Sequence, residues 1–318
     1  MCIFLTTCAH PAFPFILISN RDEYFLRPTA LAHFHSNKIL SPYDLARNER
    51  GTWIGVNKAG KIAVLVNFHE DNYDSIYSKV SRGLIPMQFL KSPKKSKDWE
   101  LELYDLYQNK ENFVQKIGGF SLLFGELSYN KTANSINPLK IISNRGDEEK
   151  KQKNVKFNQN DNPIPINFSS ENSENTLKQQ YSNKKFIGLS NSLFNHPWPK
   201  VQIGENLLNN LITNSINENW QEQKIIQKLF ELLSFNSFQI DKEFPSENFN
   251  NLKNSIFIPP FEVKDNKIPN IIGKYYGTRT QTIILLDKQG NLKYIERSLH
   301  TKDTLTEPSF DNVYSFNI

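Results

Sequence analysis

Runs of apolar residues near both ends of the chain predict β-strands, whereas helical spacing between them predicts helices. Runs rich in β-branched and aromatic residues at 3–7 and 15–19 are separated by Pro11 and Pro14. They therefore predict an antiparallel hairpin. Further strands are predicted at 52–56, 62–66, 120–127, 139–143, 186–191, 282–287 and 292–298. The continuous apolar run at 63–66 predicts a strand that is buried on both faces.

Apolar residues at helical spacing predict helices over 99–117, around 207–212 and over 220–233. The prolines at 197 and 199 mark the start of the second helix. Strands gathered at both ends of the chain, with helices between them, favour an α+β layered fold over alternating βαβ units. We expect one domain that spans residues 1–318.

The stretch 147–185 consists mainly of Asn, Lys, Glu, Gln and Ser. It has too few apolar side chains to offset the entropy that ordering would cost. This composition predicts a polar insertion at the surface, and disorder of the insertion is left open.

Charge and cysteine usage narrow the class of protein. The net charge of +5 comes from 38 basic and 33 acidic residues that are interspersed, which argues against a nucleic-acid partner. Cys2 and Cys8 fit neither a zinc site nor a C-x-x-C motif, so no metal site and a reducing compartment are expected. No run approaches the roughly 18 apolar residues of a membrane span. The start also lacks the features of a signal peptide. We therefore expect a soluble, cytoplasmic protein.

The N-terminal hairpin carries the candidate chemistry. In the simplest register Cys2 lies across from Asn20, and Asn20 and Asp22 share a face. Removal of Met1 would give Cys2 a free α-amine with an ordinary pKa of about 7.7–8.0. Such an amine activates the thiol of an N-terminal nucleophile. A lone cysteine near an N-terminus is, however, more often an inert buried residue.

Several motifs occur together along the chain. They are Met1-Cys2-Ile3, Asn20-Arg21-Asp22-Glu23 with Arg27-Pro28, Gly51-Thr52-Trp53-Ile54-Gly55, Gly188-Leu189-Ser190-Asn191 with Pro197-Trp198, Tyr276-Gly277-Thr278-Arg279-Thr280 and Glu296-Arg297-Ser298. In this combination the chain resembles the transport and Golgi organisation protein 2 family, also called the NRDE family. The resemblance implies the four-layer αββα fold of N-terminal-nucleophile hydrolases. It also implies a role in Golgi organisation, protein secretion and the handling of haem or lipid, and it leaves association with Golgi or mitochondria open.

A more distant resemblance is to the choloylglycine hydrolase and penicillin V acylase group. The chain keeps Cys2 and Asn20-x-Asp22, but it has Ser19 where that group has an arginine. By local context Asn67, Asn191 and Arg279 match later site positions. Cys2, Asp22, Asn67 and Asn191 are thus candidate catalytic residues, and Asn20, Arg21 and Arg279 are candidate substrate-binding residues. The alternatives are a strand-end turn for Asn67 and a surface ion pair between Arg21 and Asp22.

Two functions of different classes follow from these resemblances. The first is the family role, with a small-molecule ligand such as haem or an acylated compound bound in a carrier. The alternative is an N-terminal cysteine amidohydrolase or acyltransferase that acts on non-peptide C–N bonds. The chain contains no Cys-Pro haem motif and no C-x-x-C-H, so we expect no resident cofactor, and haem would be a carried ligand. The sequence leaves the protein partners, the substrate and the retention of catalysis open.

Overall fold

Two antiparallel sheets with associated helices make up the chain, which confirms the α+β class. The computed structural model describes residues 2–35, 38–69, 80–109, 117–132, 135–145, 164–166, 184–241, 248–263 and 273–318. The chain divides into two units. The first comprises Met1–Pro28, Lys185–Ser190 and Phe194–Asn317, and the second comprises Thr29–Lys184, Asn191–Leu193 and Ile318.

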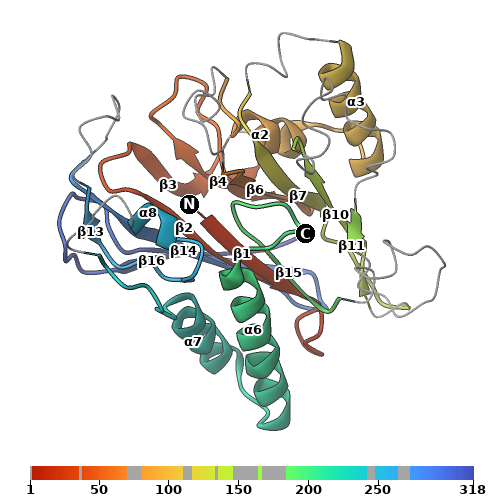
Figure 1. Cartoon of the computed structure of the whole chain (residues 1–318). Coiled ribbons are helices and arrows are strands. Elements are labelled where there is room, and N and C mark those ends of the chain that lie inside the picture. Colours follow the sequence, from red (N-terminus) through yellow and green to blue (C-terminus); the bar gives the residue numbers. More distant parts are fainter. Residues whose placement is uncertain are drawn as a thin grey trace. The chain divides into compact units, whose positions relative to one another are not determined.

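The sheet of the first unit joins the N-terminal hairpin to strands from the second half of the chain (Figure 1). Its strands are β1 (Cys2–Thr7), β2 (Phe15–Tyr24), β12 (Phe186–Leu189), β13 (Phe261–Glu262), β14 (Tyr275–Leu286), β15 (Asn291–Ser298) and β16 (Phe310–Asn317). Among the described residues the strand order is β12-β1-β2-β14-β15-β16, and β13 pairs with β14. The predicted hairpin of β14 and β15 is confirmed.

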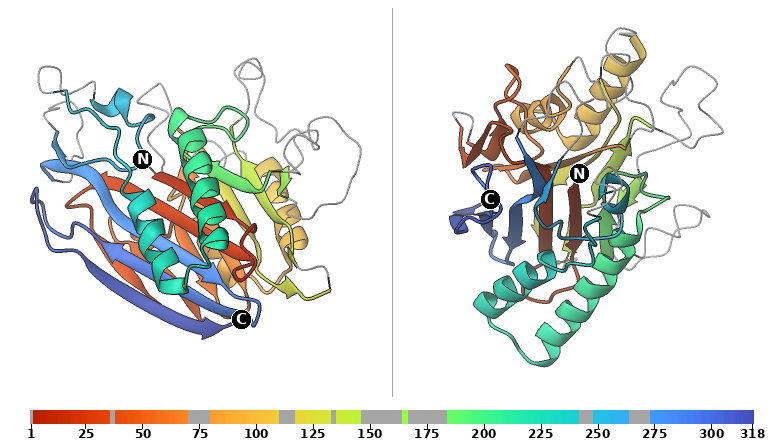
Figure 2. Two further views of the ribbon diagram at one scale, coloured as in Figure 1. Left: turned by 90° about the horizontal axis from the view of Figure 1, so that it is seen from below. Right: turned by 60° about the vertical axis from the view of Figure 1, so that its left-hand side comes forward.

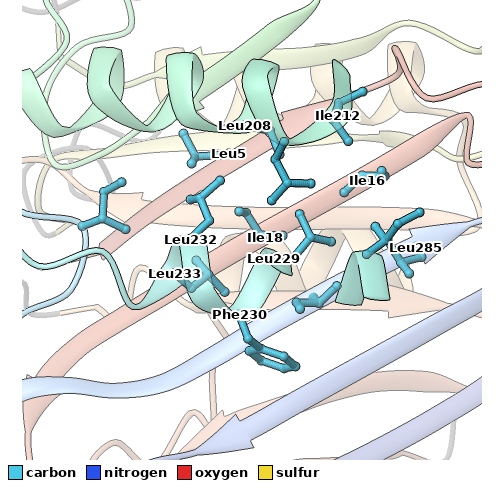
Figure 3. Packing of buried hydrophobic residues seen from close by; sticks show 14 of the residues in the cluster. Leu5, Ile16, Ile18, Leu208, Ile212, Leu229, Phe230, Leu232, Leu233 and Leu285 are labelled. Carbon is cyan, nitrogen blue, oxygen red and sulfur yellow. The ribbon is translucent and has the colours of Figure 1, made fainter. Parts of the chain in front are cut away.

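Helices α6 (Pro199–Asn217) and α7 (Glu222–Leu233) cover one face of this sheet (Figure 2). Leu208 and Ile212 of α6 and Leu229 of α7 pack against Ile16 and Ile18 of β2 (Figure 3). A short helix, α8 (Asn248–Asn251), precedes β13. The predicted start of α6 at the prolines is confirmed, because Pro199 is its first residue.

Two glycines bring α6 close to the sheet. A Cβ on Gly204 would lie 2.7 Å from Leu5 Cδ1, and a Cβ on Gly188 would lie 2.8 Å from Val201 Cγ1. The N-terminal turn of α6 can therefore lie directly against β12 and β1, where larger side chains would hold it away.

The predicted hairpin of β1 and β2 is confirmed, but the expected register is wrong by one residue. Cys2 pairs with Arg21, and Ile3 pairs with Asn20. The core explains this shift, because Ile3, Leu5, Ile16 and Ile18 all belong to the cluster under α6 and α7. A one-residue slip would send the apolar residues of one strand to the opposite face.

The second unit is built on another antiparallel sheet, with the order β11-β10-β7-β6-β5-β4-β3 in the described residues. Its strands are β3 (Thr29–Phe34), β4 (Ile39–Asp44), β5 (Ile54–Asn57), β6 (Lys61–Asn67), β7 (Phe120–Glu126), β10 (Leu139–Ser143) and β11 (Ile164–Ile166). A separate pair is formed by β8 (Tyr129–Asn130) and β9 (Ser135–Ile136). Residues 63–66 of β6 are buried on both faces, as predicted.

Helices α2 (Leu84–Lys91) and α3 (Ser96–Asn109) contribute Phe89 and Trp99 to the core of this unit. The predicted continuation of α3 to Ile117 is wrong, since Ile117 forms a parallel bridge with Val80. Residues 110–116 lie outside the described part. None of the helices in the described ranges combines the length and apolar composition needed to cross a bilayer.

Most of the predicted insertion at 147–185 also lies outside the described residues. One part that is described, β11, pairs antiparallel with β10 through Ile164 opposite Ile141 and Ile166 opposite Leu139. The polar stretch therefore contains an edge strand, because the Ile-Pro-Ile segment supplies apolar residues that the surrounding composition lacks.

Candidate functional site

Cys2 begins β1 and is partly exposed. Its carbonyl oxygen accepts a hydrogen bond of 2.7 Å from Ser190 Oγ, at the end of β12. Burial raises the pKa of the Cys2 thiol, the positive charge of the chain's N-terminus lowers it, and among the side chains Asp22 and Glu23 raise it while Arg21 lowers it. The thiol therefore needs additional positive charge to become a thiolate near neutral pH.

Asp22 lies on the helix-covered face of β2, and its side chain is completely buried. Thr278 Oγ1 of β14 donates a hydrogen bond of 2.7 Å to Asp22 Oδ1, and Lys200 Nζ lies 3.7 Å from Asp22 Oδ2. Tyr276 Oη donates to the Asp22 carbonyl oxygen at 3.2 Å. Burial raises the pKa of Asp22, whereas the Lys200 charge and the Thr278 hydrogen bond lower it. The carboxylate is thus fixed by neighbours from β14 and α6.

Lys200 is the functional candidate that sequence reasoning missed. It is the second residue of α6 and is fully buried. Burial lowers the pKa of its ammonium, and Asp22 raises it. A signal was present in the sequence, because residues 200, 204, 208 and 212 follow one another at four-residue spacing. This spacing places Lys200 on the same stripe as Leu208 and Ile212, which face the sheet.

Arg21 and Glu23 lie on the other face of β2. Arg21 Nη2 is 3.3 Å from Glu23 Oε2, and Arg27 Nε is 3.5 Å from the same oxygen. Burial would raise the pKa of Glu23, but the two guanidinium groups hold it below its ordinary value. The alternative of a surface Arg21–Asp22 ion pair is wrong in its location, because both side chains are buried and successive strand residues point to opposite faces.

Asn20 and Arg279 are engaged with backbone carbonyl groups. Asn20 Nδ2 donates to Leu233 O at 2.8 Å and to Ile256 O at 2.9 Å. Arg279 is the additional residue of a β-bulge, since Thr278 pairs with Asp22 and Thr280 pairs with Arg21. Its guanidinium donates to the carbonyl oxygens of residues 24, 27 and 300. Burial and neighbouring Arg21 lower the pKa of Arg279 to about 10. Both side chains therefore brace loops around the strand ends.

The structure brings the other two candidates, Asn67 and Asn191, together in the second unit. Asn67 is the exposed last residue of β6. Asn191 Nδ2 donates to the Asn67 carbonyl oxygen at 2.6 Å, and the His69 amide donates to Asn191 O at 2.8 Å. The Asn191 side chain thus holds the end of β6, and this contact occupies one of its amide hydrogens.

His33 and His35 lie together in the second unit, with ring centroids 4.3 Å apart. The His35 ring stacks on Tyr43, and its Nε2 lies 3.1 Å from Ser41 O. In the described ranges no group of three or more His, Cys, Asp or Glu residues is arranged to hold a metal ion. These histidines are thus explained as a packed aromatic cluster.

A scan against models of protein families matches residues 1–301 to the family Transport and Golgi organisation 2. The chain belongs to this family. An uncharacterised protein of Saccharomyces cerevisiae is 30% identical over 341 residues, with all of both chains covered. The Transport and Golgi organization protein 2 homologue of Homo sapiens is 27% identical over 305 residues, which cover 92% of this chain and 89% of the human one. The mouse homologue is 26% identical over 320 residues, covering 96% and 94%.

This member of the Transport and Golgi organisation 2 family is only remotely similar to the following solved structures. A Caenorhabditis elegans orthologue of N-acylethanolamine-hydrolyzing acid amidase gives a TM-score of 0.31 at 11% identity, covering 90% of this chain and 92% of that one. The C2A mutant of conjugated bile acid hydrolase from Clostridium perfringens gives 0.37 at 9% identity, covering 100% and 97%. Scores this low carry no argument about activity.

Proposed function

We propose that this protein acts in Golgi organisation and protein secretion, with the handling of haem or lipid, and that its chemistry is that of an N-terminal cysteine amidohydrolase or acyltransferase. The observation that carries the chemical part is the partly exposed Cys2 beside the fully buried Asp22–Lys200 pair. A buried ion pair is often no more stabilising than apolar residues of similar volume. Ionisable groups with perturbed pKa values cluster preferentially at functional sites.

The proposed reaction starts after Met1 has been removed. The α-amine of Cys2 takes the thiol proton, and Sγ attacks the carbonyl carbon of the substrate amide. The C–N bond then breaks, the leaving nitrogen takes the proton from the α-ammonium, and a thioester remains on Cys2. Water or an acceptor attacks this thioester, with the α-amine as base, and the thiol is regenerated. Asp22 would orient the α-ammonium.

We assign the remaining candidate residues to oxyanion stabilisation and to substrate binding. Asn67 and Asn191 would donate to the oxyanion, where one donor contributes about 3–4 kcal/mol. Asn20, Arg21 and Arg279 would bind substrate, with an arginine taking a carboxylate or phosphate. The four-layer αββα fold, a cytoplasmic location and association with Golgi or mitochondria also belong to the proposal, as does the absence of nucleic-acid partners and of a resident cofactor.

A second candidate function is a non-catalytic carrier of haem or an acylated ligand. The engagement of Asn20 and Arg279 with backbone carbonyl groups favours it, because these contacts leave fewer polar groups for a substrate. A carrier would also require no thiolate, which agrees with the raised pKa of the Cys2 thiol.

Cys2 discriminates the two functions, with Cys8 as an internal control. Cys8 is also partly exposed, and burial raises its thiol pKa well above the ordinary value. For a hydrolase, intact mass shows that Met1 is absent, and iodoacetamide labels Cys2 faster than Cys8. Cys2→Ser then abolishes turnover of acyl amides or thioesters while the fold is kept. Equal labelling of the two cysteines, together with full cellular rescue by Cys2→Ser, would leave only the carrier.

A further inference from the structure

Lys200 occupies a position that is unfavourable for an ammonium group on two counts. Its side chain has no solvent exposure, and it lies in the first turn of α6, where the helix dipole is positive. Within the described part of the chain no hydrogen-bond acceptor reaches Nζ, and the ion pair with Asp22 at 3.7 Å is its charged contact. The Trp198 ring lies 5.7 Å from Nζ. Stability alone does not account for a cation placed in this way.

The Lys200 ammonium is tied to Cys2 through β2. Cys2 pairs with Arg21, so Asp22 follows directly on the partner strand. The charge of Asp22 acts on the Cys2 thiol, and a Cys2 thiolate in turn stabilises the Lys200 ammonium. The charge of the Asp22 carboxylate therefore acts both on the Cys2 thiol and on the buried Lys200 ammonium, with which it forms the ion pair.

Other charged or titratable groups act on Cys2 or on the β2 residues next to it. In the first unit they are the ammonium of the N-terminus, Arg21, Asp22, Glu23 and Arg27 of the β2 segment, Lys200 of α6, and Tyr276 and Arg279 of β14. The negative charge of Glu23 is offset by the guanidinium groups of Arg21 and Arg27. Thr278 is neutral, so its hydrogen bond does not cancel the charge of Asp22. The positive charges that do offset it are those of Lys200, the larger contribution, and of the chain's N-terminus.

We propose that Lys200 is a positioning residue of the Cys2 site, which neutralises Asp22 so that the Cys2 thiol does not face an uncompensated carboxylate. This inference rests on the proposed function, because it gives Lys200 a part in the chemistry of Cys2. Without Lys200 the buried carboxylate would oppose formation of the thiolate. It would also hold the α-amine of the processed N-terminus as an ammonium, which is no base.

The test is the pH profile of Cys2 alkylation by iodoacetamide in the full chain, followed by mass spectrometry of the Cys2 peptide. Lys200→Met should raise the midpoint by roughly one unit, the lower end of the effect of a nearby charge. Asp22→Asn should lower it, and the double variant should return it close to that of the parent. Lys200→Arg, which keeps the charge, should shift it less than Lys200→Met.

A purely structural role predicts a different pattern. Both single variants would then lower the melting temperature without moving the Cys2 midpoint in opposite directions, and that result would overturn the proposal. If Lys200→Met does not fold, the comparison of Asp22→Asn with the double variant tests the proposal. Adding Lys200→Met to Asp22→Asn must then raise the Cys2 midpoint again. The Cys8 profile should not move. Alkylation needs no substrate, so these shifts are tested independently of turnover, whose absence would overturn only the proposed function.

Discussion

The side-chain amide of Asn20 shows how one motif serves both structure and chemistry. Asn20 and Asp22 face α6 and α7, whereas Arg21 shares the opposite face with Cys2. The amide of Asn20 donates a hydrogen bond to the carbonyl oxygen of Leu233 at the end of α7. The Asp22 carboxylate forms an ion pair with Lys200 and accepts a hydrogen bond from Thr278. Within one tetrapeptide, Asn20 therefore stabilises the backbone of neighbouring segments, whereas Asp22 belongs to the charged site.

Asn20→Ala is expected to lower the free energy of unfolding by about 2–3 kcal/mol. The substitution removes two hydrogen bonds and leaves the buried carbonyl oxygens of Leu233 and Ile256 without this donor. Urea unfolding measures the change. Asn209→Ala, at an exposed position of α6, is the matched control and should stay within about 0.5 kcal/mol of the parent. An equally small effect at residue 20, with weakened ligand binding, would favour a substrate-binding role.

Among the elements, the β3–β4 hairpin carries a pH-dependent contribution to stability. Burial, followed by the charge of His33, lowers the pKa of His35 to about 4. Between the ordinary pKa of about 6.5 and this value, the unfolded chain binds a proton that the folded chain does not. The free energy of unfolding should therefore fall as the pH falls through this window. The cluster with Tyr43 loses stability on acidification.

His35→Gln should flatten this dependence, because residue 35 no longer titrates in either state. The comparison is the free energy of unfolding at neutral pH and near pH 5, measured for parent and variant. His35→Phe keeps an aromatic ring against Tyr43 and should flatten the profile as well. A slope in both variants as steep as that of the parent would contradict the assignment to His35.

For the whole molecule, the polar stretch 147–185 should contribute to stability mainly through β11. Replacing residues 167–183 with a Gly/Ser sequence of equal length should change the melting temperature by less than about 2 °C, since Phe168, Leu177 and Tyr181 are its only large apolar residues. Replacing 147–185 also removes the pairing of β11 with β10 and should lower it by roughly 2–8 °C.

Differential scanning calorimetry compares the two replacements directly. A large drop for the shorter replacement would mean that residues 167–183 pack against the rest of the chain. Equal and small effects of both would mean that β11 adds little to the sheet.

Local patterns in the sequence were sufficient for much of the fold. Alternation and apolar runs identified β1, β2, β6, β14 and β15, and helical spacing identified α6 and α7, because these signals depend on neighbouring residues. The same reasoning missed β4, α2 and β16. It also extended α3 too far, since the apolar Ile117 fits a helical stripe as well as the bridge that it forms with Val80.

The sequence by itself determined the family motifs and the N-terminal thiol. It also determined the polar cluster at residues 20–23, which the predicted hairpin brings near that thiol. Tertiary structure alone decided that Cys2 pairs with Arg21, that Arg279 forms a bulge and that Lys200 reaches Asp22. The physical reason is that register depends on which apolar residues share one core. In the same way, the partner of a buried charge depends on how a distant helix packs on the sheet.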